Sequence, residues 1–414
     1  MTCHEITALG YFVLTAGVFL TTIVKISHKP QYLQPIKPNT LKVDDASNLE
    51  STKHRIHNSK INKNHFKKYK FNKTALENQN PNIFFLKTHK TGSSTVQNIL
   101  FRYAKNYNRT IVWPKGNMLF FNYSNKFSVD YVNGSTLKNS IVLHHLRYSS
   151  DVKYVFENKV PKNNVPNPES PVFRFTILRQ PATLIPSVYS YYGYGSSNNF
   201  DSFLGNLNNS NKASLRNGQL FDLGFPDYNG DQLTKIEMAI DLIEKRFDLV
   251  MILERFDECL MILKKFYFPW LELMDLVYFV KNAQVKVENK ANSSNTIGAA
   301  NLRSAKLREW AIGDQRLYNH FSEILDSKIA EYGSNQLAAD LLVFREMNKK
   351  ISKKCFTGNF LEAKSGSKIA RDHQVWVSEN SSIKIPVIRD SEQTDQLCLD
   401  LQRSEMSFHN KLHP

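Results

Sequence analysis

Short apolar runs, separated by polar stretches, recur along the middle of the chain. They are rich in β-branched and aromatic residues, and runs of this length without polar alternation are typical of strands buried inside a parallel sheet. We therefore predict buried strands at Ile83–Leu86, Ser140–His145, Val172–Leu178 and Asp248–Leu253.

Apolar residues spaced three or four positions apart flank these runs and predict amphipathic helices. One helix is expected to begin at Ser93, and others cover Ala182–Tyr192, Gln232–Arg246, Phe256–Phe266 and much of the chain from Ala299 onward. Strands that alternate with helices predict an α/β fold with a central, mainly parallel sheet flanked by helices. Ligands of such a sheet bind at the carboxyl ends of its strands.

One long apolar run occupies residues 8–26, near the N-terminus. A helix of this length crosses a hydrocarbon layer of about 30 Å, so we predict a transmembrane anchor preceded by a short tail at residues 1–7. A cleaved signal peptide is the alternative, although no Lys or Arg precedes the run and no clear A-x-A site comes after it. Lys25 and Lys29, at and after the end of the run, favour a cytosolic position for the chain on their C-terminal side.

The chain after the anchor divides by composition. Residues 27–80 lack a sustained apolar period and are rich in Lys, Asn and His around residues 53–73, which indicates a solvated stem. We predict a folded domain at residues 81–348 and an extension at residues 349–414 with no role indicated. The formal charge of +16 over 414 residues favours anionic partners. The basic stem lacks interleaved aromatic residues, so nucleic acid is not a predicted partner.

Two features indicate a secretory compartment. Cys3 precedes the anchor and Cys259 lies in an apolar helical pattern, which leaves Cys355 and Cys398 as a candidate disulfide. N-x-[ST] acceptor sites for glycans lie at Asn72, Asn108, Asn122, Asn133, Asn208, Asn292 and Asn380. Both features indicate that the chain after the anchor lies in the lumen, although the positions of Lys25 and Lys29 favour the cytosol.

A lysine-rich turn joins the first predicted strand to the helix after it. Gly92 allows the backbone to turn tightly, and hydroxyl residues follow where the helix begins. A helix N-terminus offers unpaired N–H groups and a positive dipole end, so this turn predicts a phosphate or sulfate site. The nucleotide-triphosphatase spacing GxxxxGK[ST] is absent, since Lys90 precedes the glycine. The residues expected to hold the anion are Lys87, Thr91, Gly92, Ser93, Ser94 and Thr95, with Lys90 beside them.

The string FLKTHKTGSST, at residues 85–95, resembles the 5′-phosphosulfate loop of sulfotransferases that use 3′-phosphoadenosine-5′-phosphosulfate (PAPS). In full it is similar to the galactose 3-O-sulfotransferase family, and the similarity includes LFDLGF at residues 220–225 and the stretches 247–263 and 310–321.

This resemblance implies a P-loop-like sulfotransferase fold and transfer of the sulfuryl group of PAPS to the 3-hydroxyl of galactose. The acceptor would be a glycolipid of the galactosylceramide type or a glycan, and no metal is required. The resemblance also implies a glycosylated, single-pass type II protein of the Golgi membrane. In this family's chemistry, Lys90 would offset the charge that builds on the leaving phosphate.

A second motif is expected to bind the 3′-phosphate of the donor. Arg179 follows a predicted strand, and Ser187 lies two turns along the next helix. An arginine and a helix-borne hydroxyl can converge on one phosphate, and the spacing resembles the 3′-phosphate motif of sulfotransferases. Gln180 stands where that family commonly has Asp or Asn, and Pro186 bends the helix directly before the serine.

Two histidines are candidates for the base that takes the hydroxyl proton. His89 lies beside the phosphosulfate lysine, and His145 ends a predicted strand. We favour His89 as the base and His145 as an acceptor-orienting group or alternative base, while His144 should face the opposite side of its strand. Asp222 and Glu254 are weaker candidates for the acceptor pocket.

Two other functions compete with this interpretation. A sulfotransferase for another sugar, of the heparan sulfate 2-O type, has a related lysine-first loop. A non-catalytic glycan-binding Golgi protein could keep the same fold without turnover. A comparison of sulfate acceptors would distinguish the first alternative from a galactose sulfotransferase. An absence of PAPS binding would support the second alternative.

Overall fold

The computed structural model describes residues 81–133, 140–156, 171–192, 200–205, 207, 213–283, 295–379 and 381–413. The tail, anchor and stem that we predict at residues 1–80 lie outside this part of the chain. Among the described helices, none has both the length and the apolar composition needed to cross a bilayer.

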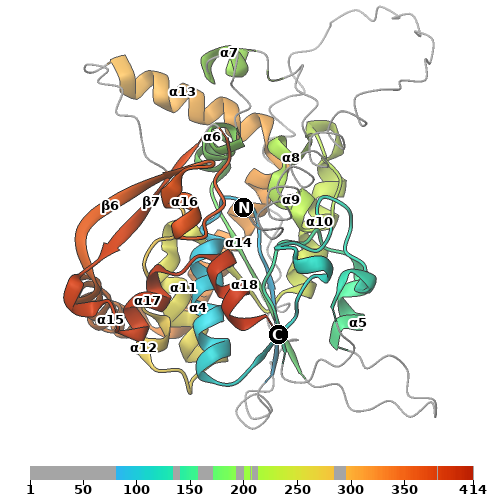
Figure 1. The fold of residues 1–414 in the computed structure, drawn as a ribbon. Helices are drawn as coiled ribbons and strands as arrows, with labels where there is room; N and C mark the ends of the chain where they lie inside the picture. The colour runs from blue at the N-terminus through green and yellow to red at the C-terminus, as the bar shows by residue number, and fades with distance from the viewer. Residues whose placement is uncertain are drawn as a thin grey trace, which may run out of the picture. The chain divides into compact units, whose positions relative to one another are not determined.

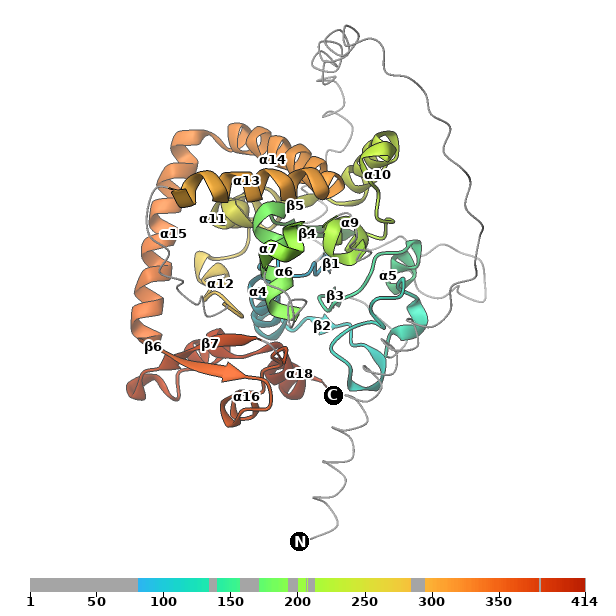
Figure 2. The same cartoon turned by 90° about the horizontal axis from the view of Figure 1, so that it is seen from above.

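A parallel sheet of five strands, in the order β2-β3-β1-β4-β5, forms the centre of the fold (Figures 1 and 2). Ile83 of β1 pairs with Ile141 of β3, and Phe85 of β1 pairs with Phe175 of β4. This confirms the predicted α/β class and mainly parallel sheet. The strands are β1 Asn82–Leu86, β2 Thr110–Ile111, β3 Ser140–Val142, β4 Val172–Leu178 and β5 Leu249–Ile252.

Strand β3 is shorter than the predicted Ser140–His145. Beyond Val142 the Leu143 carbonyl accepts a hydrogen bond of 3.0 Å from the Gln97 side chain instead of a backbone N–H of a neighbouring strand. This frees the next two residues, His144 and His145, to turn toward other partners. The two-residue strand β2 was not predicted, since so short an element shows no apolar pattern.

Helices cover both faces of the sheet. Helices α4, α11 and α12 lie on one face, and α9 and α10 lie on the other (Figures 1 and 2). The predicted helix Phe256–Phe266 forms as α11 followed by a π-helical turn at Leu263–Tyr267. The helices up to residue 276 are α4 Ser93–Asn106, α5 Lys153–Phe156, α6 Pro181–Tyr192, α7 Phe200–Gly205, α8 Ala213–Arg216, α9 Gly218–Asp222, α10 Leu233–Arg246, α11 Phe256–Ile262 and α12 Leu273–Leu276.

Three long helices come next, as the helical pattern after Ala299 predicts. They are α13 Asn295–Trp310, α14 Ile312–Tyr332 and α15 Ser334–Cys355. Short 3₁₀ helices occur at Lys115–Asn117, Val129–Tyr131, Ser150–Val152, Gly230–Gln232, Leu253–Arg255 and Asp390–Glu392.

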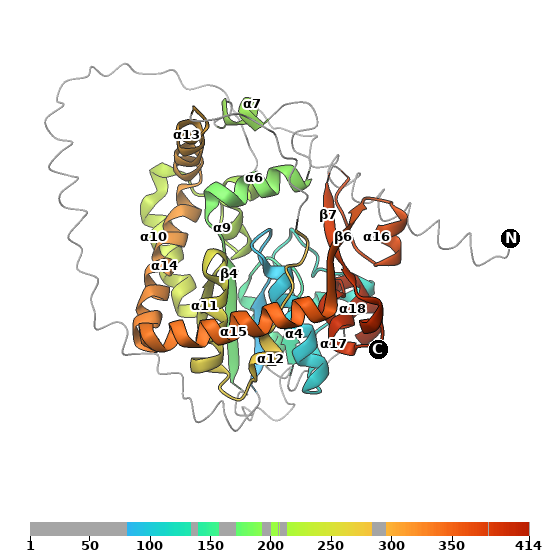
Figure 3. The same ribbon diagram turned by 90° about the vertical axis from the view of Figure 1, so that its left-hand side faces the viewer.

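The C-terminal segment after α15 has a regular structure that its sequence did not predict. It consists of an antiparallel pair, β6 Phe356–Lys364 and β7 Ser382–Ile388, with helices α16 Lys368–Asp372, α17 Gln396–Gln402 and α18 Glu405–Leu412. A disulfide between Cys355 and Cys398 joins the end of α15 to α17, which confirms the predicted pairing. Helix α18 lies beside α4 (Figure 3), and the Phe101 and Phe408 rings stack at 4.8 Å between centroids.

The core of the sheet is largely aromatic. Phe84 and Phe85 of β1 and Phe173 and Phe175 of β4 have almost no solvent exposure. Each such side chain contributes about 1.5–3 kcal/mol on burial. This packing holds the ends of β1 and β4 in fixed positions beside each other.

Candidate active site

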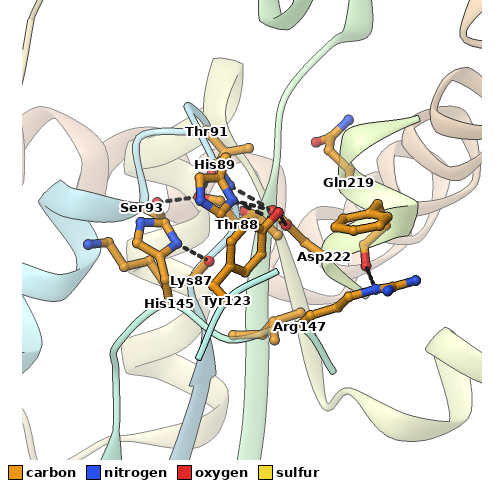
Figure 4. Close-up of polar contacts among 12 residues, drawn as sticks. Lys87, Thr88, His89, Thr91, Ser93, Tyr123, His145, Arg147, Gln219 and Asp222 are labelled. Atoms are coloured by element: carbon orange, nitrogen blue, oxygen red, sulfur yellow. Dashed lines mark hydrogen bonds and ion pairs between the residues drawn. The ribbon is translucent and has the colours of Figure 1, made fainter. Parts of the chain in front are cut away.

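A tight loop leaves the carboxyl end of β1 and leads into α4 (Figure 4). Gly92 precedes the helix with φ +78°, and a Cβ atom there would lie 2.5 Å from Cδ1 of Leu253. Both the backbone conformation and the close approach of a side chain therefore require glycine. The Thr95 N–H donates to the Gly92 carbonyl at 2.9 Å and starts the helix.

Hydroxyl groups of the loop hold the loop itself. The Thr88 hydroxyl donates to the Ile177 carbonyl of β4 at 2.6 Å. The Ser93 and Thr91 hydroxyls donate to the Thr88 carbonyl at 2.5 and 3.2 Å. The protons of these three hydroxyls are thus engaged within the loop, and the groups that remain for an anion include the N–H groups at the start of α4.

The two residues after Ser93 touch a neighbouring segment. The Thr95 hydroxyl oxygen accepts a hydrogen bond of 3.1 Å from the Lys281 N–H, and the Asn282 side chain lies 3.4 Å from the Ser94 hydroxyl. The first turn of α4 is therefore fixed from outside as well as by the loop.

Lys90 and Arg179 meet at the edge where β1 and β4 end. The Arg179 Nη1 atom donates to the Lys90 carbonyl at 3.0 Å, and the Lys90 Nζ atom lies 3.6 Å from the centre of the Tyr191 ring. Burial, and then the charge of Arg179, lower the pKa of Lys90 to about 7. A lysine and an arginine that are both partly buried at one strand edge form a site suited to a strongly anionic ligand.

Arg179 is held from both sides. Its backbone N–H donates to Oε1 of Gln219 at 2.7 Å, and its Nε donates to the Thr183 hydroxyl at 3.0 Å. The predicted partner Ser187 lies further along α6, half-buried and directly after Pro186. That Arg179 and Ser187 share one phosphate stays a prediction.

Glu254 accepts a hydrogen bond of 3.0 Å from the Gln180 N–H at the start of α6.

His89 is bound by a buried carboxylate. Its Nδ1 atom lies 3.0 Å from Oδ2 of Asp222, and its backbone N–H donates to the same oxygen at 2.9 Å. Asp222 is 1% exposed and also accepts a hydrogen bond of 2.7 Å from the Tyr123 hydroxyl (Figure 4). Because a carboxylate only accepts, Nδ1 carries the proton, and Nε2 is the nitrogen that can take up another.

His145 stacks on His89. The ring centroids are 4.1 Å apart with an interplanar angle of 18°, and the His145 Nδ1 donates to the Lys87 carbonyl at 2.9 Å. Burial, followed by the charges of Lys87 and His89, holds the pKa of His145 well below its usual value, so the ring is neutral. His144 turns the other way and lies 3.0 Å from Glu405, in agreement with the predicted opposite orientation.

We predicted that Lys87 holds the anion with the other loop residues, but its side chain is buried against a carboxylate of the C-terminal segment instead. The residue is 1% exposed, and its Nζ atom donates to Oε2 of Glu405 in α18 at 2.5 Å. Sequence reasoning gave no indication of Glu405 or of Tyr123. It named Asp222 only as a candidate for the acceptor pocket and not as the partner of His89.

Comparison with known proteins places this site in a family. The sequence model of the family described as galactose-3-O-sulfotransferase matches residues 67–414. The chain belongs to the galactose-3-O-sulfotransferase family. Every site residue described above lies within the matched range.

Individual relatives agree. Human galactosylceramide sulfotransferase is 30% identical over 295 residues, which cover 67% of this chain and 64% of the relative. Human galactose-3-O-sulfotransferase 2 is 30% identical over 293 residues, 66% of this chain and 68% of the relative. Mouse galactose-3-O-sulfotransferase 3 is 28% identical over 356 residues, 80% of this chain and 77% of the relative. The matched part is thus just under two thirds of the human galactosylceramide enzyme.

Proposed function

We propose that the protein transfers the sulfuryl group of PAPS to the 3-hydroxyl of a galactose residue in a glycolipid of the galactosylceramide type or in a glycan. The family and the names of the relatives support the reaction class. The observation that carries the proposal is the contact between Lys90 and Arg179. This contact supports the proposal because it joins the expected phosphosulfate loop to the expected 3′-phosphate motif.

The donor would lie across the ends of β1 and β4. The N–H groups at the start of α4, with Thr91, Gly92, Ser93, Ser94 and Thr95 around them, would bind the 5′-phosphosulfate. Arg179 and Ser187 would bind the 3′-phosphate at the other end. Lys90, between the two, would offset the negative charge on the leaving phosphate oxygen.

His89 would act as the base. As the galactose oxygen forms its bond to sulfur, the bond from sulfur to the phosphate oxygen breaks and the hydroxyl proton passes to Nε2 of His89. The Asp222 carboxylate compensates the imidazolium charge that results. His145 has a neutral carbonyl as its partner and is flanked by Lys87, so it is the poorer proton acceptor. We assign to His145 the role of orienting His89 and the acceptor.

The proposed setting is the lumen of the Golgi, with the predicted helix at residues 8–26 as a type II anchor. The Cys355–Cys398 disulfide supports an oxidising compartment. Three acceptor sites, Asn108, Asn122 and Asn133, are exposed and accessible to glycans. Sensitivity of the expressed protein to an N-glycosidase, and protection of its C-terminal part from protease in intact microsomes, test this orientation.

The function is tested by incubating the purified full-length protein with labelled PAPS and an acceptor panel. The panel contains galactosylceramide, galactose-terminated oligosaccharides and uronic-acid polymers, and linkage analysis locates the sulfate. We expect label on the galactose 3-hydroxyl, and loss of most transfer in Lys90→Ala and in Arg179→Ala. Label on uronic acid alone, or wild-type turnover in both variants, would contradict the proposal.

A further inference from the structure

The C-terminal helix α18 begins with Glu405, whose carboxylate bonds to the first residue of the loop after β1. Oε2 of Glu405 accepts from Lys87 at 2.5 Å, and Oε1 accepts from the Gln97 amide at 2.6 Å. The same Oε1 lies 3.0 Å from Nδ1 of His144. One side chain from the end of the sequence therefore bonds to three side chains of the central domain.

These three partners belong to the elements that carry the site. Lys87 directly follows β1 and opens the loop, His144 lies beyond the end of β3 next to His145, and Gln97 is in the second turn of α4. The Lys87 carbonyl accepts the hydrogen bond that fixes His145, and His145 stacks on His89. A chain of direct contacts thus leads from Glu405 to the proposed base.

Glu405 is ionised in this position. Burial alone would raise its pKa, but the charge of Lys87 and the hydrogen bond and charge of His144 bring the pKa to about 2. The Lys87 side chain is 2% exposed, so its charge is neutralised by Glu405 and is shielded from solvent. Loss of Glu405 would leave the buried Lys87 charge without compensation.

We propose that Glu405 is a positioning residue of the active site, which fixes the Lys87 end of the loop and the histidine end of β3, so that α18 completes the site. In this arrangement Lys87 acts through the loop and His145, and Lys90 and Arg179 are the cations that meet the donor. The inference rests on the proposed function for its activity readout but not for its structural readout.

The test compares Glu405→Gln, the double variant Lys87→Met/Glu405→Met, and the control Asp400→Asn. Asp400 is the control because its carboxylate also belongs to the C-terminal segment and pairs with Lys105 of α4, with Arg403 and with Lys411 of α18, but with none of the three partners of Glu405. The double variant removes both charges together, so it is expected to fold even if Glu405→Gln does not.

Two measurements are made on each folded variant. Steady-state kinetics give kcat and the KM for PAPS, and mass spectrometry gives the rate at which diethylpyrocarbonate modifies His144 and His145. For both Glu405 variants we expect kcat to fall by about 10-fold to 100-fold while the KM for PAPS changes by less than about threefold. Histidine modification should accelerate by at least about tenfold. Asp400→Asn should match the wild type in both readouts.

The outcomes separate the inference from the proposed function. A folded Glu405 variant with wild-type kcat and wild-type histidine protection would overturn the inference and leave α18 a stabilising element only. A wild-type protein that transfers no sulfate to any galactoside would overturn the proposed function. In that case the histidine modification rates still decide for or against Glu405.

Discussion

His89 and Asp222 are joined twice, because the same carboxylate oxygen lies 3.0 Å from the ring Nδ1 and 2.9 Å from the backbone N–H of the histidine. One acidic group therefore fixes both the imidazole ring and the loop from which it projects. The Tyr123 hydroxyl, at 2.7 Å, holds the carboxylate in turn. The arrangement sets the tautomer of the proposed base before any acceptor binds.

Replacement of this carboxylate should disable turnover more than binding. In Asp222→Asn we expect kcat to fall by about 100-fold or more, because the amide neither enforces the Nδ1–H tautomer nor compensates the imidazolium charge. The KM for PAPS should change little, since the Asp222 carboxylate bonds to His89 and Tyr123, which we do not assign to donor binding. Initial rates over a range of PAPS concentrations at saturating galactoside measure both quantities.

Asp227→Asn is the matched control. Asp227 lies five residues further along and binds Arg216 and Asn217, away from the histidines. It should keep the wild-type kcat. Equal loss in the two variants would mean that this region of the chain is only structurally sensitive and that Asp222 has no special link to His89.

Lys90 should make donor binding depend on pH. With a pKa of about 7 in the free protein, the Lys90 side chain is mostly a neutral amine at pH 8 and mostly a charged ammonium at pH 6. An anionic ligand raises the pKa of a neighbouring lysine, so Lys90 should take up about one proton when the ligand binds at pH 8 and almost none when it binds at pH 6. Calorimetry of adenosine 3′,5′-bisphosphate binding in buffers of different ionisation enthalpy measures this uptake.

The same titration on Lys90→Met identifies the group. The variant has no ammonium at this position, so proton uptake at pH 8 should disappear and affinity should no longer fall as the pH rises from 6 to 8. If uptake persists unchanged in Lys90→Met, another group titrates on binding and the assignment of this pKa to donor recognition is wrong.

The proximity of Lys90 and Arg179, the two ends of the proposed donor site, could be predicted from sequence for a simple physical reason. Lys90 and Arg179 each follow a buried apolar strand, and parallel strands bring their carboxyl ends to one edge of a sheet. The contact between them at 3.0 Å follows from the pairing of β1 with β4. Local pattern alone was therefore enough to place residues that are 89 positions apart.

Glu405 could not be predicted in this way. It is 318 positions from Lys87, and its segment has too weak an apolar period to show that it folds. Its place depends on how α18 packs on α4 through Phe408 and Phe101, which is a property of the complete fold. Asp222 lay in a segment similar to the family, but its sequence could not show that it faces His89.

Arg179 should contribute mainly to donor affinity. In Arg179→Ala we expect the dissociation constant for adenosine 3′,5′-bisphosphate to rise by about 10-fold to 100-fold, since a charge-assisted contact to phosphate is lost. Arg179→Lys should recover only part of the affinity, because an ammonium lacks the two-pronged geometry of the guanidinium. Calorimetric titration measures the constants.

Arg174→Ala is the control for this change. Arg174 lies in the same strand β4, at the end away from the site, and its guanidinium donates to the Val172 carbonyl at 3.3 Å. The variant should bind the nucleotide like the wild type. A comparable loss of affinity in Arg174→Ala would mean that the loss in Arg179→Ala comes from a change in β4 as a whole or in net charge.

The Cys355–Cys398 disulfide should protect activity as well as stability. It closes a loop with a sequence separation of 43, which in the chain-entropy model stabilises the fold by about 4 kcal/mol. Because it fixes α17, and α18 follows directly, its loss should also loosen Glu405. In Cys355→Ser/Cys398→Ser we expect a lower melting temperature by calorimetry and a reduced kcat at temperatures well below the transition. A variant that melts earlier but keeps the wild-type kcat when fully folded would show that the disulfide acts on stability alone, and that Glu405 stays in place without it.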